Sequence, residues 1–214
     1  MKYFDTFMSL RSSGDILNVV NPLGSRASKE ITESMAMFSR LRKIALKAPM
    51  EYSLIDLCAG NALTSVLAAH VLPLKESIAV DKKLRKRGWE SVRRFRYLNQ
   101  DIFDDSIYEL ITDRTVICSV HPCSRLASRI VEIYLKSPAP YLVMMPCCEG
   151  QIKIKGSFLR ERLGRYACWC LQLAEQANGD LIQDNNCISP KNIVITAKKP
   201  IRYEVLDEDD GGIG

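Results

Sequence analysis

The sequence predicts an α/β fold: a Rossmann-like, doubly wound, mostly parallel sheet with an antiparallel last strand and helices on both faces. Strongly apolar runs alternate with helical segments along most of the 214 residues. These runs are apolar on both faces, which is typical of parallel strands covered by helices on either side. The last two runs are joined by too few residues for a crossover helix, so we expect them to pair antiparallel.

The elements follow one another in a regular order. An amphipathic helix is predicted over 29–48, because Ile31, Met35, Phe38, Leu41 and Ala45 recur at helical spacing. Further helices are predicted over 62–71, 124–136 and 158–177. Strands are predicted at 53–58, 77–81, a short segment finishing around 99–103, 115–120, 141–145, around 182–188, and 192–198.

One domain is expected to hold these elements. With 47% hydrophobic residues, the chain can close one substantial core. We assign residues 29–200 to that domain and residues 1–28 to a loosely docked N-terminal arm, which carries turn signals such as Asn21-Pro22. Residues 201–214 form an acidic tail that ends in glycines.

The composition and charge indicate the cellular location of the protein and the partners that it can bind. The formal net charge of +5 and the pI near 8.7 permit contact with an anion such as RNA. The chain shows neither a secretory signal nor a stretch of about 18 uninterrupted apolar residues, so we expect a cytoplasmic or otherwise intracellular protein without membrane contact. Several of the eight cysteines lie in apolar runs, which favours buried, reduced thiols over disulfides.

Polar residues stand where the predicted strands end. Asp56 precedes the turn Ala59-Gly60-Asn61, and Asp81 ends the second strand about twenty residues after the glycine. An acid at that spacing can accept hydrogen bonds from both hydroxyls of a ribose. Ligands of open parallel sheets bind at the carboxyl ends of the strands, so these residues are candidates for a binding site.

The motif DLCAGNA, together with Asp81 and Asp101, resembles the class I S-adenosylmethionine-dependent methyltransferases over roughly 31–199. The resemblance implies S-adenosylmethionine as cofactor, with Asp81 at the ribose and Asp101 beside the adenine amino group. Unlike the usual family turn, this one has a single glycine. The implied cofactor-binding residues are Asp56, Cys58, Ala59, Gly60, Asn61, Thr64, Asp81, Lys82, Asp101 and Ile102.

Two further strand ends read His121-Pro122-Cys123 and Pro146-Cys147-Cys148. Within the class they are similar to a subgroup that contains tRNA 2′-O-methyltransferases and uncharacterised members. The resemblance implies that His121, Cys123, Pro146 and Cys147 line the acceptor side. His121 is then a general base, a positioning group or a structural residue. Cys123 is either a nucleophile like that of cytosine-5 methyltransferases or a small buried thiol.

Two other readings of these motifs are weaker. A nicotinamide dinucleotide site needs GxGxxG, whereas the corresponding positions here are Gly60, Ala62 and Ser65. A zinc site would need His121, Cys123, Cys147 and Cys148 to converge, but no CxxC pair occurs and adjacent cysteines in a strand point to opposite faces. Cys168 and Cys170 lie about 200° apart around their helix. We therefore expect no metal site.

The densest charge is the run KKLRKRGWESVRRFR at 82–96, which contains Trp89 and Phe95. It is either a solvated helix face or a surface that contacts phosphates. The candidate nucleic-acid-binding residues are Lys82, Lys83, Arg85, Lys86, Arg87, Arg93, Arg94 and Arg96.

The hypothesis is a methyltransferase that acts on an oxygen or nitrogen of RNA by direct methyl transfer, with a partner subunit supplying specificity. The alternatives are a catalytically inactive protein of the same fold that binds RNA or a partner, and a methyltransferase that acts on a protein or a small molecule.

Overall fold

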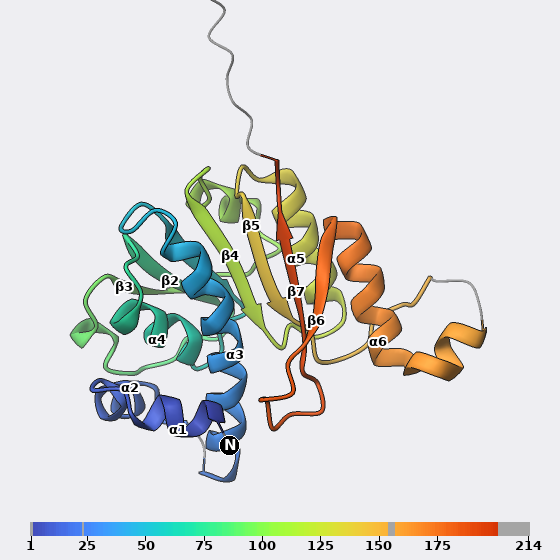
Figure 1. Cartoon of the computed structure of the whole chain (residues 1–214). Coiled ribbons are helices and arrows are strands. Elements are labelled where there is room, and N and C mark those ends of the chain that lie inside the picture. Colours follow the sequence, from blue (N-terminus) through green and yellow to red (C-terminus); the bar gives the residue numbers. More distant parts are fainter. Residues whose placement is uncertain (1, 23, 154–156, 201–214) are drawn as a thin grey trace, which may run out of the picture.

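The computed structural model describes residues 2–22, 24–153 and 157–200; the predicted acidic tail, 201–214, lies outside them. A seven-stranded sheet in the order β3-β2-β1-β4-β5-β7-β6 forms its centre (Figure 1). The first five strands of this order are parallel, and β7 runs antiparallel to both neighbours, which confirms the predicted fold class. The strands are β1 Ser53–Leu57, β2 Glu76–Asp81, β3 Phe95–Asn99, β4 Thr115–Val120, β5 Tyr141–Met145, β6 Gly179–Gln183 and β7 Ile193–Lys198.

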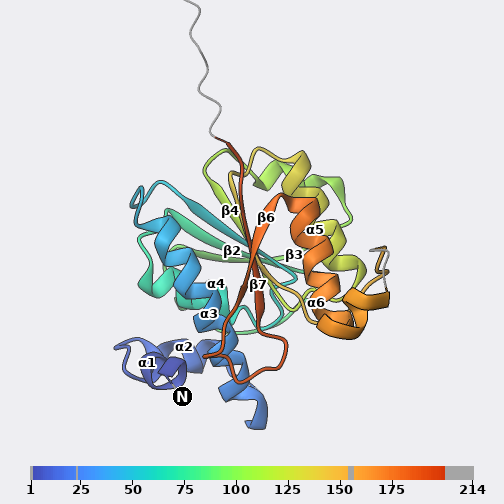
Figure 2. The ribbon, with the colours of Figure 1, turned by 45° about the vertical axis from the view of Figure 1, so that its right-hand side comes forward.

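Helices cover both faces of the sheet, as Figures 1 and 2 show. The α3–α4 pair packs on one face with α1 and α2 beside it, and α5 and α6 pack on the other. The α-helices are α1 Lys2–Met8, α2 Ser13–Val20, α3 Ala27–Ala45, α4 Leu63–Val71, α5 Arg125–Lys136 and α6 Ser157–Ala177. Three short 3-10 turns are η1 Gly24–Arg26, η2 Trp89–Ser91 and η3 Asp105–Leu110.

The apolar runs become strands because each contributes to two cores. Successive side chains of a strand point to opposite faces, so Leu54 packs toward α3 and α4 while Ile55 packs toward α5. Val116 and Ile117 divide in the same way on β4. A sheet sandwiched between helix layers therefore explains why these runs lack the polar alternation of a half-exposed strand.

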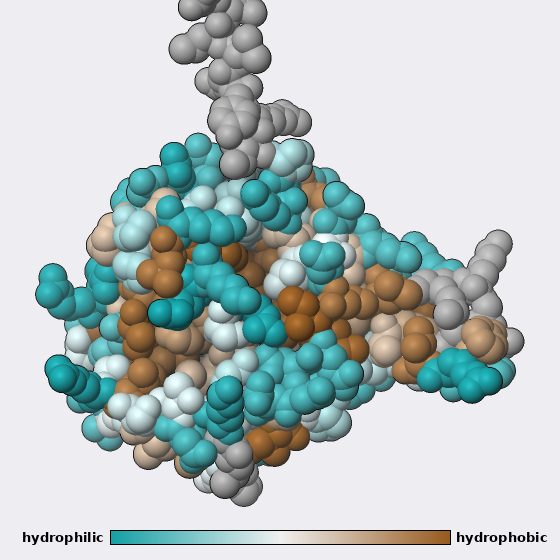
Figure 3. All heavy atoms as spheres, viewed as in Figure 1, coloured by the Kyte–Doolittle hydropathy of each residue, from teal (hydrophilic) through white to brown (hydrophobic). Residues whose placement is uncertain are grey.

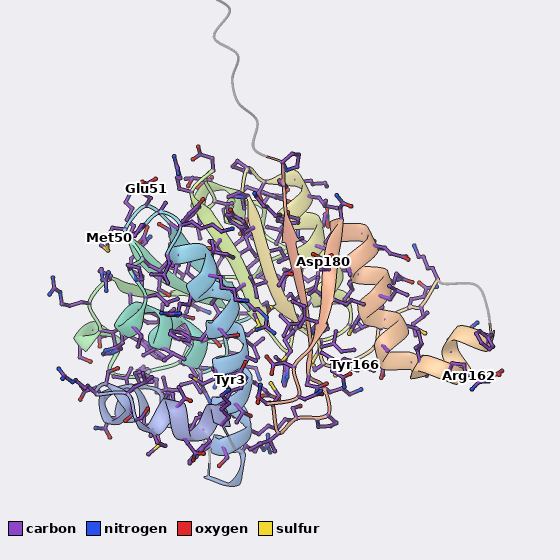
Figure 4. The ribbon with its side chains drawn as sticks, in the orientation of Figure 1. Tyr3, Met50, Glu51, Arg162, Tyr166 and Asp180 are labelled. Atoms are coloured by element: carbon purple, nitrogen blue, oxygen red, sulfur yellow. The ribbon has the colours of Figure 1, made fainter. Side chains whose placement is uncertain are left out.

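The N-terminal segment is more firmly packed than the loosely docked arm predicted from its turn signals. Phe7, Ile16 and Val20 are completely buried and belong to the same core as α3 and α4. The Tyr3 hydroxyl also donates a hydrogen bond of 2.8 Å to Asp184 Oδ2, and Figure 4 labels Tyr3 beside the lower part of α3. The apolar faces of α1 and α2 therefore pack the N-terminal segment against the core, although turn residues lie between the two helices.

Two elements near the C-terminus differ from the prediction. The helix expected over 158–177 contains a non-helical residue, Gly164 (φ 76°), which divides α6 into two pieces. The strand expected around 182–188 begins at Gly179, because Asn178 adopts a left-handed conformation (φ 50°) that ends the helix and starts the strand at once. The antiparallel pairing of β6 and β7 is confirmed.

None of the helices within the described ranges is long and apolar enough to cross a bilayer.

Candidate functional site

The predicted polar residues gather at the carboxyl edge of the parallel strands. In Figure 1 this is the lower end of β4 and β5, close to the beginning of α3. Parallel strands end at the same edge, so the loops after β1, β2, β4 and β5 become neighbours there. A first group of residues follows β1, β2 and β3, and a second group follows β4 and β5.

The turn after β1 has an unusual backbone. Cys58 (φ 61°), Gly60 (φ 56°) and Ala62 (φ 59°) are all left-handed, at alternate positions. Only glycine adopts this conformation without a penalty of roughly 1–2 kcal/mol. The turn therefore keeps three left-handed positions although only one of them is glycine. A Cβ added to Gly60 would meet no atom within 4 Å, so the backbone at that point faces open space.

Asp81 binds directly to this turn. The Gly60 amide donates to Asp81 Oδ2 at 2.8 Å, and the Lys83 amide donates to Asp81 Oδ1 at 2.8 Å. A carboxylate offers about four lone-pair positions, so each oxygen can accept a further hydrogen bond. The glycine and the acid that the sequence placed about twenty residues apart are thus in contact.

Asp56 lies beneath the turn and is only 2% exposed. Its Oδ2 accepts a hydrogen bond of 2.5 Å from Ser65 Oγ, and the buried thiol of Cys118 on β4 also interacts with the carboxyl group. Burial raises the pKa of Asp56 to about 7, against the opposing effect of the Ser65 hydrogen bond.

The remaining residues of the first group differ from one another in exposure and in contacts. Asp101 Oδ2 lies 2.8 Å from Lys82 Nζ, and this contact is the main reason that the pKa of Asp101 is lowered. Ile102 and Thr64 are each 3% exposed, and Thr64 Oγ1 donates to Ser34 Oγ on α3. Ala59 and Asn61 are partly exposed in the turn itself. Thr64 and Ile102 therefore support the site from the interior.

In the second group, His121 faces an acid that the sequence did not reveal. Its Nε2 lies 3.1 Å from Oε1 of Glu33, a contact that is close but not aligned as a hydrogen bond. Glu33 lies on α3 and is only 2% exposed. One turn earlier, burial raises the pKa of Glu30, whose carboxylate accepts from Asn61. The signal for Glu33 was its position within the almost wholly apolar or small stretch ITESMAMF of an amphipathic helix, and Glu30 directly precedes that stretch.

The cysteines after β4 and β5 form a cluster. Cys123 Sγ lies 3.4 Å from Cys147 Sγ, and Cys147 Sγ lies 3.4 Å from Cys148 Sγ. Cys147 and Cys148 do not point to opposite faces as expected, because β5 ends at Met145 and both residues lie in the following loop. The interpretation of Cys123 as a buried thiol is also wrong, since Cys123 and Cys148 are exposed. Every cysteine in the described chain is a free thiol.

Tyr166 of α6 holds the loop that follows β5. Its hydroxyl donates to the Pro146 carbonyl at 3.0 Å and accepts from the Ile193 amide at 3.3 Å. Figure 4 labels it where α6 passes the lower ends of the strands. The sequence predicted only the apolar face of this helix, which gave no indication that a tyrosine on it would hold the Pro146-Cys147 loop.

The basic run is not a helix face but a loop that contains η2. Its aromatic residues turn inward: Trp89 and Phe95 are each 8% exposed, and Trp89 stacks on Tyr97 with ring centroids 5.1 Å apart. The loop leaves β2 at the carboxyl edge and returns to the opposite edge, where Arg94 donates to two backbone carbonyls and Arg96 pairs with Glu76. Only its first part, with Lys82, Lys83 and Lys86, lies near the carboxyl edge.

Two surface hollows lie elsewhere on the molecule. One of about 500 Å³ lies between α5 and α6 and includes Glu132, Lys153 and Gln172. The other, of about 400 Å³, lies beside His70 and Arg94 at the opposite edge of the sheet. Neither of these two hollows contains a residue of the two groups described above.

Comparison with known proteins supports this architecture. The structure resembles that of the CurJ carbon methyltransferase, with 13% sequence identity and a TM-score of 0.51 over 87% of this chain; the chain spans 57% of the length of that structure. It also resembles the methyltransferase domain of bacterial CtHen1, with 9% identity and a TM-score of 0.50, covering 78% of this chain and 100% of that one. At these identities the likeness concerns the fold alone.

No curated protein sequence matches the chain. A protein-family model described as "Methyltransferase domain" matches residues 26–155, more than half of the 214 residues, and this range includes both groups at the carboxyl edge. The chain therefore belongs to the class I methyltransferase-domain family, whose cofactor is S-adenosylmethionine.

Proposed function

We propose that this domain transfers the methyl group of S-adenosylmethionine to an oxygen or nitrogen of RNA by direct displacement. The observation that carries the proposal is the contact between the glycine turn and the second acid, Gly60 to Asp81, above a buried acid, Asp56. These three residues offer an approachable backbone and two acceptors in one place.

The first group fits the cofactor on its own features. The buried Asp56 carboxyl is an acceptor suited to an ammonium group, and Asp81 retains lone pairs for ribose hydroxyls. The open space at Gly60 allows close approach of a ligand to the backbone. In this scheme Cys58, Ala59 and Asn61 shape the turn, Asp101 with Lys82 lies at the adenine side, and Thr64 and Ile102 support it from below. When bound, S-adenosylmethionine supplies an electrophilic methyl group.

The second group fits the acceptor side. His121 Nε2 faces Glu33, which leaves Nδ1 to take the proton as the acceptor atom forms its bond to the methyl carbon. Glu33 would hold the imidazole in place. Cys123, Pro146 and Cys147 line the same edge. Direct displacement gains chiefly from alignment of the donor and the acceptor, and both groups rest on one rigid sheet.

The RNA assignment rests on charge and on a resemblance. Lys83 and Lys86 are exposed on the loop that begins at Asp81, and neither makes a salt bridge within the described chain. Lys82, Arg85 and Arg87 share that loop. The motifs after β4 and β5 resemble the subgroup that contains tRNA 2′-O-methyltransferases. Phosphate groups that approach the acceptor edge would meet these side chains first.

Transfer of a tritiated methyl group to total RNA tests the proposal. We expect labelled RNA with the native protein and, at a limiting concentration of the cofactor, much less label with Asp81→Ala. A catalytically inactive protein of this fold would retain RNA and label nothing. Labelling of a protein or small-molecule pool instead would preserve the enzyme and refute the RNA assignment.

The position of the RNA surface can be tested by charge reversal. Lys83→Glu with Lys86→Glu should weaken RNA binding and reduce the slope of log affinity against log salt by about 0.7 per lost single-strand phosphate contact. Arg93→Glu is the matched control, because Arg93 is exposed on the same loop but close to the opposite edge. Equal losses in the two variants would contradict the proposed surface.

A further inference from the structure

Three thiols converge at the carboxyl edge of β4 and β5, and we call Cys123, Cys147 and Cys148 the thiol cluster. Their sulfur atoms all lie within 4.8 Å of one another. Cys147 lies between the other two, at 3.4 Å from each. Lining the acceptor side does not require three thiols in contact, so their convergence requires a separate explanation.

The backbone on the β4 side turns the first thiol toward the others. His121 (φ 58°) and Ser124 (φ 44°) flank the Pro122-Cys123 pair, and both are left-handed although neither is glycine. Two backbone hydrogen bonds join this turn to the β5 side: His121 N–H donates to Met145 O at 2.8 Å, and Ser124 N–H donates to Cys148 O at 3.3 Å. The two loops are thereby held together on either side of the sulfurs.

The loop on the β5 side is anchored independently of its cysteines. Tyr166 binds the Pro146 carbonyl, and Lys191 Nζ lies 3.1 Å from Glu149 Oε1. A Cβ on Gly150 would lie 2.4 Å from the ring of Trp169, so only glycine fits where α6 crosses the loop. Packing on both sides of Cys147-Cys148 therefore sets where these thiols lie, before any ligand is present.

The spacing of the sulfurs suits one soft metal ion. Thiolates bind zinc at about 2.3 Å, and a tetrahedral arrangement then separates any two sulfurs by about 3.8 Å. The observed separations, two of 3.4 Å and a third of no more than 4.8 Å, lie on either side of that value. Small side-chain rotations would equalise them. A disulfide, with a bond of about 2.05 Å, would join only two of the sulfurs and leave the third without a role.

The cluster offers three protein ligands and not four. The imidazole of His121 is turned to Glu33 and lies outside the cluster. Cys123 and Cys148 are exposed, so the fourth coordination position would face solvent. Three protein ligands and one open position are the arrangement of zinc sites that engage a substrate, whereas closed structural sites have four.

We propose that Cys123, Cys147 and Cys148 bind one zinc ion as thiolates and leave its fourth position open at the acceptor side of the carboxyl edge. The zinc ion would neutralise part of the negative charge of the three thiolates. It would also act as a Lewis acid beside the acceptor. The proposal departs from the expectation of no metal site, which rested on the absence of a CxxC pair and on the opposite orientation of adjacent cysteines within a strand.

Titration of the full chain with Co²⁺, followed by displacement with Zn²⁺, tests the proposal. The protein is first stripped of metal and kept with a phosphine reductant, and neither S-adenosylmethionine nor RNA is added. We expect one equivalent of Co²⁺ to produce the intense visible bands of tetrahedral cobalt with a thiolate charge-transfer band, and one equivalent of Zn²⁺ to remove them. The result is therefore independent of whether the protein methylates RNA.

Ligand variants identify the site. Cys123→Ser, Cys147→Ser and Cys148→Ser should each weaken zinc binding by more than about 100-fold, beyond the loss typical of an outer-shell contact. Cys187→Ala is the matched control, because Cys187 is a free cysteine outside the cluster. Cys148→Ser is the decisive variant, since its exposed side chain can be changed without unfolding the protein, and an unchanged melting temperature checks this. Absence of stoichiometric zinc binding, or binding unchanged in Cys148→Ser, would overturn the proposal.

Discussion

The two groups at the carboxyl edge are assembled in different ways. The first group, the proposed cofactor group, is built from residues close in sequence to the ends of β1, β2 and β3, and a hydrogen bond from the Gly60 amide to the Asp81 carboxylate joins two of its parts. The acceptor group draws on distant segments: His121 after β4, Glu33 on α3 and Tyr166 on α6. A local turn can be recognised from a short motif, whereas a site assembled by packing cannot.

The two groups should also differ in the substitutions that they tolerate. The turn after β1 keeps its left-handed backbone with cysteine and alanine at two positions, so its shape depends on the surrounding core as well as on Gly60. The acceptor group instead depends on particular side chains whose neighbours lie on other elements. We therefore expect substitutions in the two groups to affect different measured quantities.

The largest effect is expected at His121. His121→Ala should lower the rate of methyl transfer by roughly 10²–10⁴-fold, the usual contribution of a general base, while the affinity for S-adenosylmethionine stays unchanged. Single-turnover kinetics on the labelled RNA, with calorimetry for the cofactor, would measure both. Glu33→Gln should lower the rate less, by about tenfold, and Glu175→Gln on the exposed side of α6 is its control. Loss of cofactor affinity in His121→Ala would remove the distinction between the groups.

A smaller effect is expected from the titration of Asp56. Its pKa of about 7 in the folded protein lies above the ordinary value of 3.8, so the folded state binds the proton more tightly than the unfolded state. The associated stability is fully present below about pH 4 and is lost as the pH rises to about 7. Three pKa units correspond to at most roughly 4 kcal/mol.

Urea unfolding at several pH values would measure this dependence. In Asp56→Asn the fall in stability between pH 4 and pH 7 should be much reduced, whereas Asp113→Asn, an exposed acid, should behave as the native chain. An identical pH profile in Asp56→Asn and the native protein would show that Asp56 is not protonated in the folded state.

Substitution of Gly60 tests whether this residue is needed only for the backbone conformation of the turn or also for the approach of the cofactor. Gly60→Ala should cost about 1 kcal/mol of stability, because alanine is strained in a left-handed conformation, and it should lower cofactor affinity as well. Gly164→Ala is the control for cofactor affinity: Gly164 also has a positive φ (76°) and open space at its Cβ, but it lies on α6. Equal cofactor affinities in the two variants would show that the ligand does not approach Gly60.

The smallest effect is expected at the rim of the cofactor group. The Lys82 side chain is 78% exposed in its pair with Asp101, and exposed ion pairs contribute between about 0 and 1 kcal/mol. Lys82→Ala should therefore change the free energy of unfolding by no more than that. A larger loss, measured by urea unfolding, would mean that Lys82 also supports the turn after β1.

Much of the fold could be predicted from the sequence, because its strands are apolar on both faces and its helices are amphipathic. β1, β2, β4 and β5 and the antiparallel end of the sheet follow from those patterns. The N-terminal helices were misjudged because their few apolar residues, such as Phe7 and Val20, are buried only by contact with α3 and α4. The break at Gly164 also depends on a single residue within an otherwise helical pattern.

The candidate site could be predicted only in part. Asp56, Gly60 and Asp81 stand out by their order and spacing along the chain. Glu33 does not, since nothing local indicates that an acid on a buried helix face will meet His121. The convergence of Cys147 and Cys148 depends on where β5 ends, and strand ends are poorly defined by apolar patterns. Likewise, the inward turn of Trp89 is set by its stacking on Tyr97 in a neighbouring strand.

Calorimetric titration with S-adenosylmethionine tests the cofactor group most directly. The account predicts one binding site in the native chain and affinity roughly 10- to 100-fold weaker in Asp81→Ala, the loss expected for hydrogen bonds to a charged group. Asp113→Ala, with the same loss of charge at an exposed position, should bind as the native chain does. No heat of binding in the native protein, or equal affinity in Asp81→Ala, would contradict the assignment of this edge as the cofactor site.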